Sequence, residues 1–272
     1  MRFVCPKCSS EFISFTGNSA ICKNAHAYDK SREGYYNFLP PMRAGAHGDN
    51  KEMVLARRDF LDTGAYFPLA DALSRLALKY AGGENIALLD IGCGEGYYTK
   101  IICDKFNFDG KRLELSAFDI SKDAVRYTAK KIKSGDFAVA SAYHMPIGDA
   151  VFDMAVNMFS PLALSETLRV LKKDGIFIMA IPGKEHLYEI KEVLYDNPYK
   201  NELSDFHLSG FELLESKAIK YTMHLDTKEK ISSLFKMTPY AYRTKKSGID
   251  KLFSLEKLDV CASFVIIVYK KI

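Results

Sequence analysis

The 272-residue sequence has no apolar stretch that approaches the roughly 20 residues with which a helix crosses a bilayer. It also reaches Cys5 before any apolar run of the kind found in secretory signals could form. We therefore expect a cytoplasmic protein with no membrane partner. Because thiols stay reduced in the cytoplasm, the six cysteines are expected to be metal ligands or buried small residues.

The sequence also lacks a strong excess of charge of one sign. Its formal net charge is +4, which by itself does not indicate a polyanionic partner. Residues 1–60 contain nine lysines and arginines against six aspartates and glutamates, so most of the positive excess lies in this part of the chain. A solvated surface usually explains such a bias, and nucleic-acid binding is favoured only modestly by it.

No internal repeat and no low-complexity segment is found. Two regions of the sequence differ in composition and in hydrophobic pattern. Residues 1 to about 40 carry three cysteines and one histidine beside short polar turns. From about residue 86, apolar runs alternate with amphipathic stretches, which is typical of βαβ units. The expected strands are residues 86–91, 113–120, 137–142, 151–158 and 176–181. The expected helices are residues 97–105, 122–133 and 162–172, the last one stopping at Lys172-Lys173-Asp174-Gly175, and a further one over residues 187–194.

The C-terminal part has two long β-rich runs, residues 211–225 and 259–270, separated by a helix near residues 228–235. Such a late pair often forms an antiparallel edge on an otherwise parallel sheet. Residues 42–52 are the expected flexible connection, because they include three small residues and little to bury. We predict an α/β fold with three parts: an N-terminal module (1–40), a linker with a helical lead-in (41–84) and a main domain (85–272).

A glycine-rich loop follows the first strand of the main domain. It reads Asp90-Ile91-Gly92-Cys93-Gly94-Glu95-Gly96, and a helix beginning at Tyr97 follows. Glycines allow close approach of the backbone to a ligand and backbone angles that other residues avoid. The dinucleotide fingerprint G-x-G-x-x-G has a different spacing and cradles a pyrophosphate, which an acid such as Asp90 would repel. An acid here would instead attract the amino group of a methionine moiety, so the loop indicates binding of S-adenosylmethionine.

A second acid, Asp119, ends the second strand, 23 residues after Gly96. Ribose hydroxyls are bound at this position in nucleotide-binding sheets. The alternative role for Asp119 is to cap the following helix, although Ser121 could do so alone. We favour ribose binding. An acid before the glycine loop and an acid after it together predict an S-adenosylmethionine-dependent methyltransferase with a Rossmann-like class I sheet.

Four residues near the N-terminus have the spacing of zinc ligands: Cys5 and Cys8, then Cys22 and His26. The segment Thr16-Gly17-Asn18-Ser19 is the expected hairpin turn between the two pairs. Four protein ligands leave no position for a catalytic water, so the zinc would be structural. Unliganded buried cysteines are the alternative, but some 40 residues rarely form a stable core without a bound metal or a disulfide.

The other cysteines have different surroundings. Cys103 and Cys261 lie on apolar faces and are expected to be core residues, while Cys93 lies inside the glycine loop. A catalytic thiol is conceivable at Cys93, but methyl transfer from a sulfonium does not need one.

Together these features resemble the bacterial 23S ribosomal RNA guanine-N1 methyltransferases of type A, including their Gram-positive macrolide-resistance relatives. The resemblance covers nearly the whole chain. The matching elements are the zinc ligands, residues 30–39 (KSREGYYNFL), residues 56–66 (ARRDFLDTGAY), residues 90–99 and residues 237–243 (MTPYAYR). The glycine loop alone is common to many methyltransferases, whereas its combination with the N-terminal module and the two other elements is much more restrictive.

The resemblance implies that Tyr66, Glu95, Gly96 and His186 contact S-adenosylmethionine. Tyr66 could instead be a core aromatic, and His186 could cap a helix. The full set of expected cofactor-binding residues is Tyr66, Asp90, Gly92, Gly94, Glu95, Gly96, Tyr97, Asp119 and His186. Residues 157–161 (NMFSP) lack the Asp/Asn-Pro-Pro-Tyr signature of adenine-N6 enzymes, which argues against adenine as the methylated base.

The resemblance further implies that the substrate is a guanine N1 in a hairpin loop of 23S rRNA. It is compatible with a homodimer, but the sequence does not decide the oligomeric state. Arg43, Arg57 and Arg58 are candidate phosphate contacts, although Arg57 and Arg58 could simply be the polar face of a helix. No residue identifies itself as a general base. Two other classes stay open: a small-molecule methyltransferase, for which a zinc module is unusual, and a non-catalytic zinc-containing RNA-binding protein, against which the intact loop acids argue.

Overall fold

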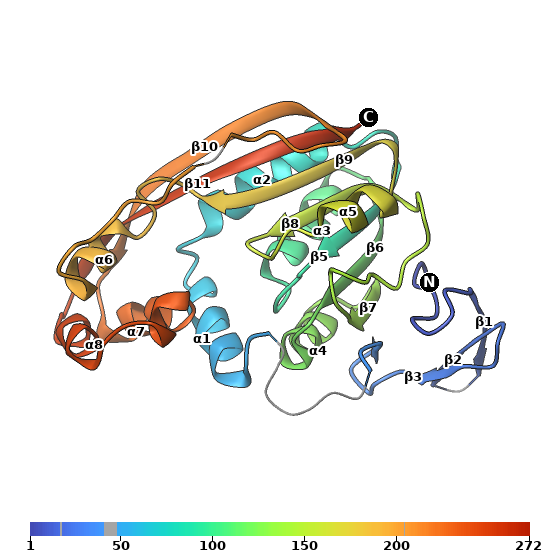
Figure 1. The fold of residues 1–272 in the computed structure, drawn as a ribbon, viewed down its shortest axis with the longest axis horizontal. Coiled ribbons are helices and arrows are strands. Elements are labelled where there is room, and N and C mark those ends of the chain that lie inside the picture. Colours follow the sequence, from blue (N-terminus) through green and yellow to red (C-terminus); the bar gives the residue numbers. More distant parts are fainter. Residues whose placement is uncertain (17, 41–47, 204) are drawn as a thin grey trace.

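The computed structural model describes residues 1–16, 18–40, 48–203 and 205–272. Its largest feature is an eight-stranded sheet with the order β10-β11-β9-β8-β5-β6-β7-β4 (Figure 1). The strands of this sheet are β4 (Tyr35–Asn37), β5 (Asn85–Ile91), β6 (Arg112–Asp119), β7 (Asp136–Val139), β8 (Phe152–Met158), β9 (Leu171–Pro182), β10 (Phe211–Leu225) and β11 (Leu258–Lys271). The five strands predicted for the centre of the sheet are therefore all present.

The order of the strands creates a switch point beside β5. From β5 the chain proceeds outward through β6 to β7, and it then returns to place β8 on the other side of β5. All pairings among β4 to β9 are parallel, whereas β11 is antiparallel to both β9 and β10. This confirms the predicted mostly parallel sheet with an antiparallel last strand. In open sheets of this kind, ligands bind at the carboxyl ends of the strands at the switch point.

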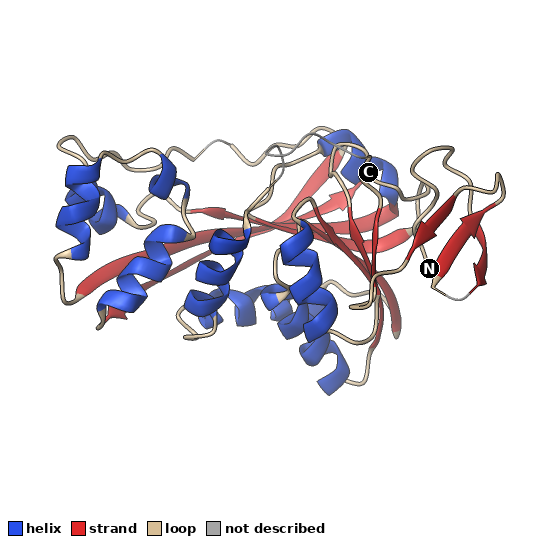
Figure 2. Cartoon of the chain, turned by 90° about the horizontal axis from the view of Figure 1, so that it is seen from below, coloured by secondary structure: helices blue, strands red, loops and turns tan. Residues whose placement is uncertain are grey.

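The central strands are buried on both faces, which is why they read as continuous apolar runs. Along β5, Ile86 and Leu88 belong to one core cluster, while Ala87 and Leu89 belong to the other. Figure 2 shows that most helices lie on one side of the sheet. They are α1 (Lys51–Leu61), α2 (Phe67–Lys79), α3 (Tyr97–Phe108), α4 (Lys122–Lys131), α5 (Leu164–Val170), α6 (Tyr188–Leu194), α7 (Lys228–Lys236) and α8 (Lys246–Phe253). None of these helices is long and apolar enough to cross a membrane.

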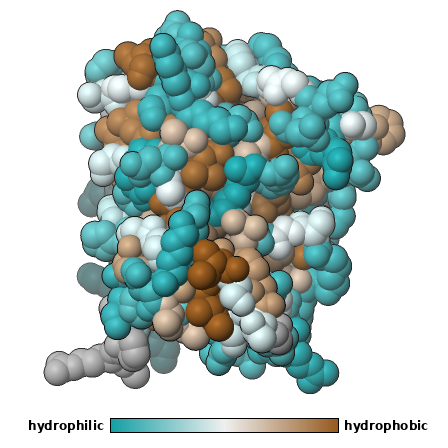
Figure 3. Space-filling view, turned by 90° about the vertical axis from the view of Figure 1, so that its right-hand side faces the viewer, coloured by the Kyte–Doolittle hydropathy of each residue, from teal (hydrophilic) through white to brown (hydrophobic). Residues whose placement is uncertain are grey.

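The N-terminal module contains the antiparallel strands β1 (Phe12–Thr16), β2 (Ser19–Cys22) and β3 (Ala27–Asp29). It then continues into β4, which pairs in parallel with β7 at the edge of the large sheet, an attachment that the sequence did not predict. Phe3 and Phe38 belong to the second core cluster, so the module is joined to the main domain by buried apolar contacts. Figure 3 shows the module's end of the molecule, where hydrophobic side chains lie among hydrophilic ones.

Three predicted segments differ from the structure or lie partly outside it. The expected helix 162–172 is only α5, because Leu171 adopts an extended backbone and begins β9. Leu171 is fully buried and pairs with Phe152, so core packing prevails over helical spacing there. Of the expected connection 42–52, residues 42–47 lie outside the described residues, and Lys51 already begins α1 behind the cap Asn50. In the expected hairpin turn, Gly17 also lies outside the described residues.

Candidate cofactor cavity and metal centre

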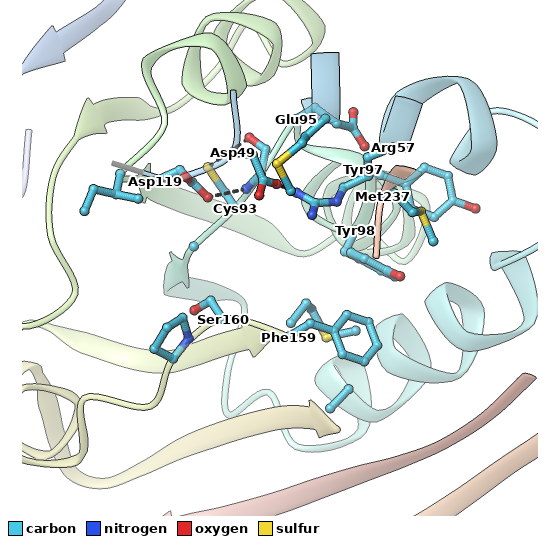
Figure 4. Close-up of a pocket in the computed structure, with 18 of the residues that line it drawn as sticks. Asp49, Arg57, Cys93, Glu95, Tyr97, Tyr98, Asp119, Phe159, Ser160 and Met237 are labelled. Carbon is cyan, nitrogen blue, oxygen red and sulfur yellow. Dashed lines mark hydrogen bonds and ion pairs between the residues drawn. The ribbon is translucent and has the colours of Figure 1, made fainter. Parts of the chain in front are cut away.

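A cavity of about 700 Å³ opens at the switch point, where β5, β6 and β8 end (Figure 4). This volume falls within the range of small-molecule sites. Eight of the nine expected cofactor-binding residues line the cavity: Tyr66, Asp90, Gly92, Gly94, Glu95, Tyr97, Asp119 and His186. Segments from the beginning and the end of the chain line it too, notably Asp49 and residues 237–240. The fold therefore brings together residues that lie almost 200 positions apart.

The ninth expected residue, Gly96, does not line the cavity but lies at the start of α3. It is the N-cap of α3 with φ +81, and a Cβ atom there would come within 3.2 Å of three atoms of Thr128 on α4. Gly92 differs, because a Cβ atom at that position would lie 2.5 Å from the Ser160 side chain. The glycine loop is thus held closely between α4 on one side and the turn after β8 on the other.

Asp90 is buried at the base of the cavity. Its Oδ2 accepts a hydrogen bond from the Thr99 hydroxyl, while its Oδ1 is buried and has no partner among the described residues. Burial raises the pKa of Asp90 to about 7. A buried carboxylate oxygen without a partner is costly, and a cationic group would satisfy it. The positively charged methionine moiety of S-adenosylmethionine fits this requirement.

Asp119 lies at the carboxyl end of β6 with both oxygens facing backbone amides. The Gly94 amide donates to Oδ2 at 3.0 Å, and the Ser121 amide donates to Oδ1 at 2.8 Å. Each oxygen still has a free lone pair, so the carboxylate can accept two hydroxyl groups without losing these bonds. Burial raises the pKa of Asp119. The side chain that caps α4 is Ser121, which accepts from the Ala124 amide, so Asp119 is not needed as a cap.

Tyr66 and His186 meet inside the cavity although 120 residues separate them. The Tyr66 hydroxyl lies 3.4 Å from His186 Nε2, and the Ser263 amide donates to His186 Nδ1. Burial lowers the pKa of His186 to about 3, so the ring is neutral. Because Nδ1 accepts, the proton is on Nε2 and points to the Tyr66 oxygen. That leaves the Tyr66 hydroxyl proton free to be donated to a ligand.

The two other predicted lining residues are Glu95 and Tyr97. Glu95 is buried and forms an ion pair with Lys131 of α4. The hydroxyl of Tyr97 stays protonated, since burial raises its pKa to about 12. Cys93 is also buried, and burial raises its pKa well above the ordinary value. A protonated thiol is a poor nucleophile, and methyl transfer from a sulfonium does not need one.

The candidate phosphate contacts Arg57 and Arg58 have other partners. Arg57 lines the cavity and forms an ion pair with Asp49, so it faces the expected cofactor site and is committed to an acid. Arg58 lies over the Tyr127 ring, 5.0 Å from its centroid. Arg43 lies outside the described residues. The phosphate contact of Arg57 stays a prediction, and Asp49, eight residues earlier in the chain, is a partner that the sequence analysis did not identify.

The four predicted zinc ligands converge in the N-terminal module. Their ligand atoms all lie within 4.8 Å of one another. Cys8 Sγ and Cys22 Sγ are 3.7 Å apart, and His26 Nδ1 lies 3.5 Å from the sulfurs of both Cys5 and Cys22. Zinc–sulfur bonds of about 2.3 Å in a tetrahedron require sulfur–sulfur edges of about 3.8 Å. Hydrogen bonding by Ser10 lowers the pKa of Cys8 to about 5, which favours the thiolate that zinc binds. The residues fit a structural zinc ion.

Changing Cys8 to serine is expected to release the zinc ion and to loosen β1–β3, because four ligands hold a module with little core of its own. Elemental analysis should find one zinc per wild-type chain and much less in the variant, and amide exchange should rise in β1–β3 but not in β5. Cys261→Ser is the matched control, since Cys261 lies outside the cluster, and it should keep the metal. Wild-type protein purified without chelators and free of zinc would contradict the prediction.

Sequence reasoning missed an aromatic part of the cavity. Tyr98, Tyr143, Phe159 and Phe264 all line it, and only the position of Phe159 after a central strand could have indicated it. The element at residues 237–240, noted only as part of the resemblance, also lies in the wall. Its placement explains why a distant C-terminal sequence accompanies the glycine loop.

Comparison with known proteins agrees with this arrangement. The family described as Methyltransferase domain matches residues 83–237, and the one described as RlmA, N-terminal, matches residues 3–43. A Bacillus subtilis protein, provisionally named 23S rRNA (guanine-N1-)-methyltransferase, is 31% identical over 99% of this chain and 97% of its own length. The 23S rRNA (guanine(748)-N1)-methyltransferase of Streptomyces fradiae is 31% identical over 82% of this chain and 79% of its own.

Solved structures show the same fold at lower sequence similarity. A Bacillus halodurans structure, provisionally named a methyltransferase, superposes with a TM-score of 0.51 and 18% identity over 74% of this chain and 99% of the other. The similarity to the Bacillus subtilis protein covers nearly the whole chain and therefore includes both the zinc module and the residues that line the cavity. The chain therefore belongs to the family of 23S rRNA (guanine-N1)-methyltransferases.

Proposed function

We propose that this protein transfers a methyl group from S-adenosylmethionine to N1 of a guanine in a hairpin loop of 23S rRNA, with release of S-adenosylhomocysteine and of the N1 proton. The similarity to enzymes named for this reaction supports the proposal. The buried oxygen of Asp90 that has no partner among the described residues supports the cofactor part of the proposal, and the four converging Cys and His ligands support the zinc module. Loops are the usual targets of sequence-specific RNA recognition, because their bases can leave the stack and enter a pocket.

One observation favours a polynucleotide over a small molecule as the substrate. A cleft of about 760 Å³ runs beside the cavity, and Ala140 and Ser141 line both. The other wall of the cleft includes Cys5, Pro6 and Ser9 of the zinc module. A substrate that entered the cavity could thus continue along the module, as a polynucleotide would. A metabolite enzyme needs only the cavity, so the small-molecule alternative leaves the cleft and the module unexplained.

The expected cofactor residues would contact different parts of S-adenosylmethionine. Asp90 would hold the cationic methionine end, Asp119 the ribose hydroxyls, and the loop glycines would let the backbone approach. S-adenosylmethionine supplies the electrophilic methyl group on its sulfonium. The chain's own residues orient the reactants and exclude water, which is the main protein contribution when a cofactor carries the chemistry. The neutral His186 and the free Tyr66 proton provide a donor without adding a positive charge.

The same proposal extends to the organisation of the protein. We take residues 1–40 as the zinc and RNA-recognition module, residues 41–84 as the connection and residues 85–272 as the methyltransferase domain. A ribosomal RNA substrate places the enzyme in the cytoplasm. We also propose a homodimer, which light scattering of the purified protein tests directly by its molar mass.

The experiment that tests the function uses the purified full chain and methyl-labelled S-adenosylmethionine. We expect label in protein-free 23S rRNA, and mass mapping of digested RNA should place it as 1-methylguanine within a hairpin loop. A total small-metabolite extract is offered in parallel, and Asp119→Ala serves as the low-activity control. Label confined to the metabolite fraction would overturn the proposal in favour of a small-molecule enzyme.

A further inference from the structure

The turn after β8 holds an aromatic residue in an unusual conformation. Phe159 has φ +62, in the left-handed region that residues other than glycine, asparagine and aspartate avoid. Its side chain is 41% exposed and lines the cavity. A large apolar residue exposed at a strained position is unfavourable for folding alone, and such strain clusters at functional sites.

The surrounding contacts fix this conformation. Asn157, buried at the end of β8, accepts a hydrogen bond from the Ser160 amide at 3.1 Å and donates to the Pro161 carbonyl at 3.4 Å. The Ser160 hydroxyl in turn donates to the Ile91 carbonyl at 3.1 Å. The turn is therefore closed by its own side chains and tied to the glycine loop.

The ring of Phe159 faces an apolar part of the cavity. It lies 6.2 Å from the Tyr98 ring and 5.6 Å from the Phe264 ring. Figure 4 places Phe159 and Ser160 on the opposite side of the pocket from Asp49, Glu95 and Arg57. The cavity therefore has a charged side and an aromatic side. The charged side suits the ionic and hydroxyl groups of the cofactor, and the aromatic side offers a flat apolar surface to a planar ligand.

We propose that Phe159 is the aromatic surface on which the target guanine stacks when it enters the cavity. This inference rests on the proposed function and names a substrate contact within it. A base taken out of an RNA loop loses its stacking partners, and an aromatic side chain replaces them. The closed turn keeps the ring in place before the base arrives, so no ordering of this side chain opposes binding.

The absence of tryptophan from the sequence allows a direct test. Phe159→Trp introduces the sole tryptophan of the chain at the proposed contact, and it preserves a stacking face. Phe108→Trp is the matched control, because Phe108 is 85% exposed at the end of α3 and outside the cavity lining. With S-adenosylhomocysteine present, adding protein-free 23S rRNA should quench the fluorescence of Phe159→Trp strongly and that of Phe108→Trp little. Polyuridylate, which offers no guanine, should quench neither.

A second variant measures the contribution to turnover. Stacking on an aromatic side chain contributes to the binding of each base, so Phe159→Leu should lower kcat/KM for 23S rRNA by about tenfold. Its affinity for S-adenosylhomocysteine should stay within about twofold of wild type by calorimetry, since the ring lies away from the charged side. Phe108→Leu should change neither quantity.

The outcomes separate this inference from the function on which it rests. If wild-type enzyme methylates no RNA, the proposed function fails first. If wild-type enzyme methylates 23S rRNA but Phe159→Leu keeps full kcat/KM, the stacking role is wrong. The role is equally wrong if Phe159→Trp binds 23S rRNA in a filter assay without quenching beyond the Phe108→Trp control.

Discussion

Asp119→Ala is expected to weaken S-adenosylmethionine binding by about a hundredfold while leaving the fold intact. The carboxylate ends β6 beside the glycine loop, and each oxygen has a lone pair beyond the one used by a backbone amide. Two hydrogen bonds from ribose hydroxyls to a charged acceptor would each contribute about 1.5–3 kcal/mol, and the lower bound of their sum corresponds to roughly a hundredfold in affinity.

Calorimetry with S-adenosylhomocysteine measures this effect, and thermal unfolding checks the fold. Asp104→Ala is the control, because Asp104 is an exposed α3 residue paired with Lys100, and its affinity should equal that of wild type. Asp119→Asn keeps one acceptor oxygen and should fall between the two. A well-folded Asp119→Ala protein with unchanged affinity would show that the ribose is held elsewhere.

The central fold could be predicted because its physical signals are local in sequence. Each parallel strand is buried on both faces and therefore appears as one apolar run. The carboxyl ends of parallel strands lie at the same edge, so Asp90 and Asp119 could be placed together from their strand-end positions alone. The zinc ligands were predictable for a similar reason, since their spacing within 22 residues limits how they can converge.

The features that the sequence did not predict depend on contacts between distant segments. Leu171 fits a helical pattern, but its pairing with Phe152 places it in a strand. The strand β4 is only three residues long, and its partner β7 lies about 100 positions later. The left-handed backbone of Phe159 depends on the amide of Asn157 and on the nearby glycine loop. No pattern of hydrophobicity or spacing encodes these three-dimensional constraints.

The attachment through β4 also changes how the zinc module can be tested. Deleting residues 1–40 would remove Phe3, Tyr36 and Phe38 from the second core cluster and uncover the edge strand β7. The methyltransferase domain would then lose stability as well as the RNA contacts that we propose for the module. A point change such as Cys8→Ser leaves these buried residues in the chain, and it is the better way to separate RNA recognition from cofactor binding.

Asp90 is expected to make the stability of the folded protein depend on pH. Its pKa in the folded protein is about 7, well above the value of about 3.9 for an exposed aspartate. Between these values the folded state holds a proton that the unfolded state has lost, so the free energy of unfolding decreases as pH rises from about 4 to about 7. Asp90→Asn removes this dependence and can still accept the hydrogen bond from Thr99. The unfolding temperature of the variant minus that of wild type should therefore be larger at pH 8 than at pH 5.

The same titration should act on the cofactor in the opposite direction. Only the ionised Asp90 attracts the cationic methionine moiety, so wild-type affinity should increase as pH rises from 6 to 7.5. At pH 7.5, Asp90→Asn should bind S-adenosylmethionine at least about tenfold more weakly, the loss expected for one charged hydrogen bond. The ratio of wild-type to variant affinity is the decisive quantity, because titration of the ligand itself cancels from it. That ratio should grow with pH through the pKa of Asp90, with Asp104→Asn behaving as wild type throughout. A ratio that stays constant from pH 6 to 7.5 would mean that the unpartnered oxygen of Asp90 does not contact the cationic end of the cofactor.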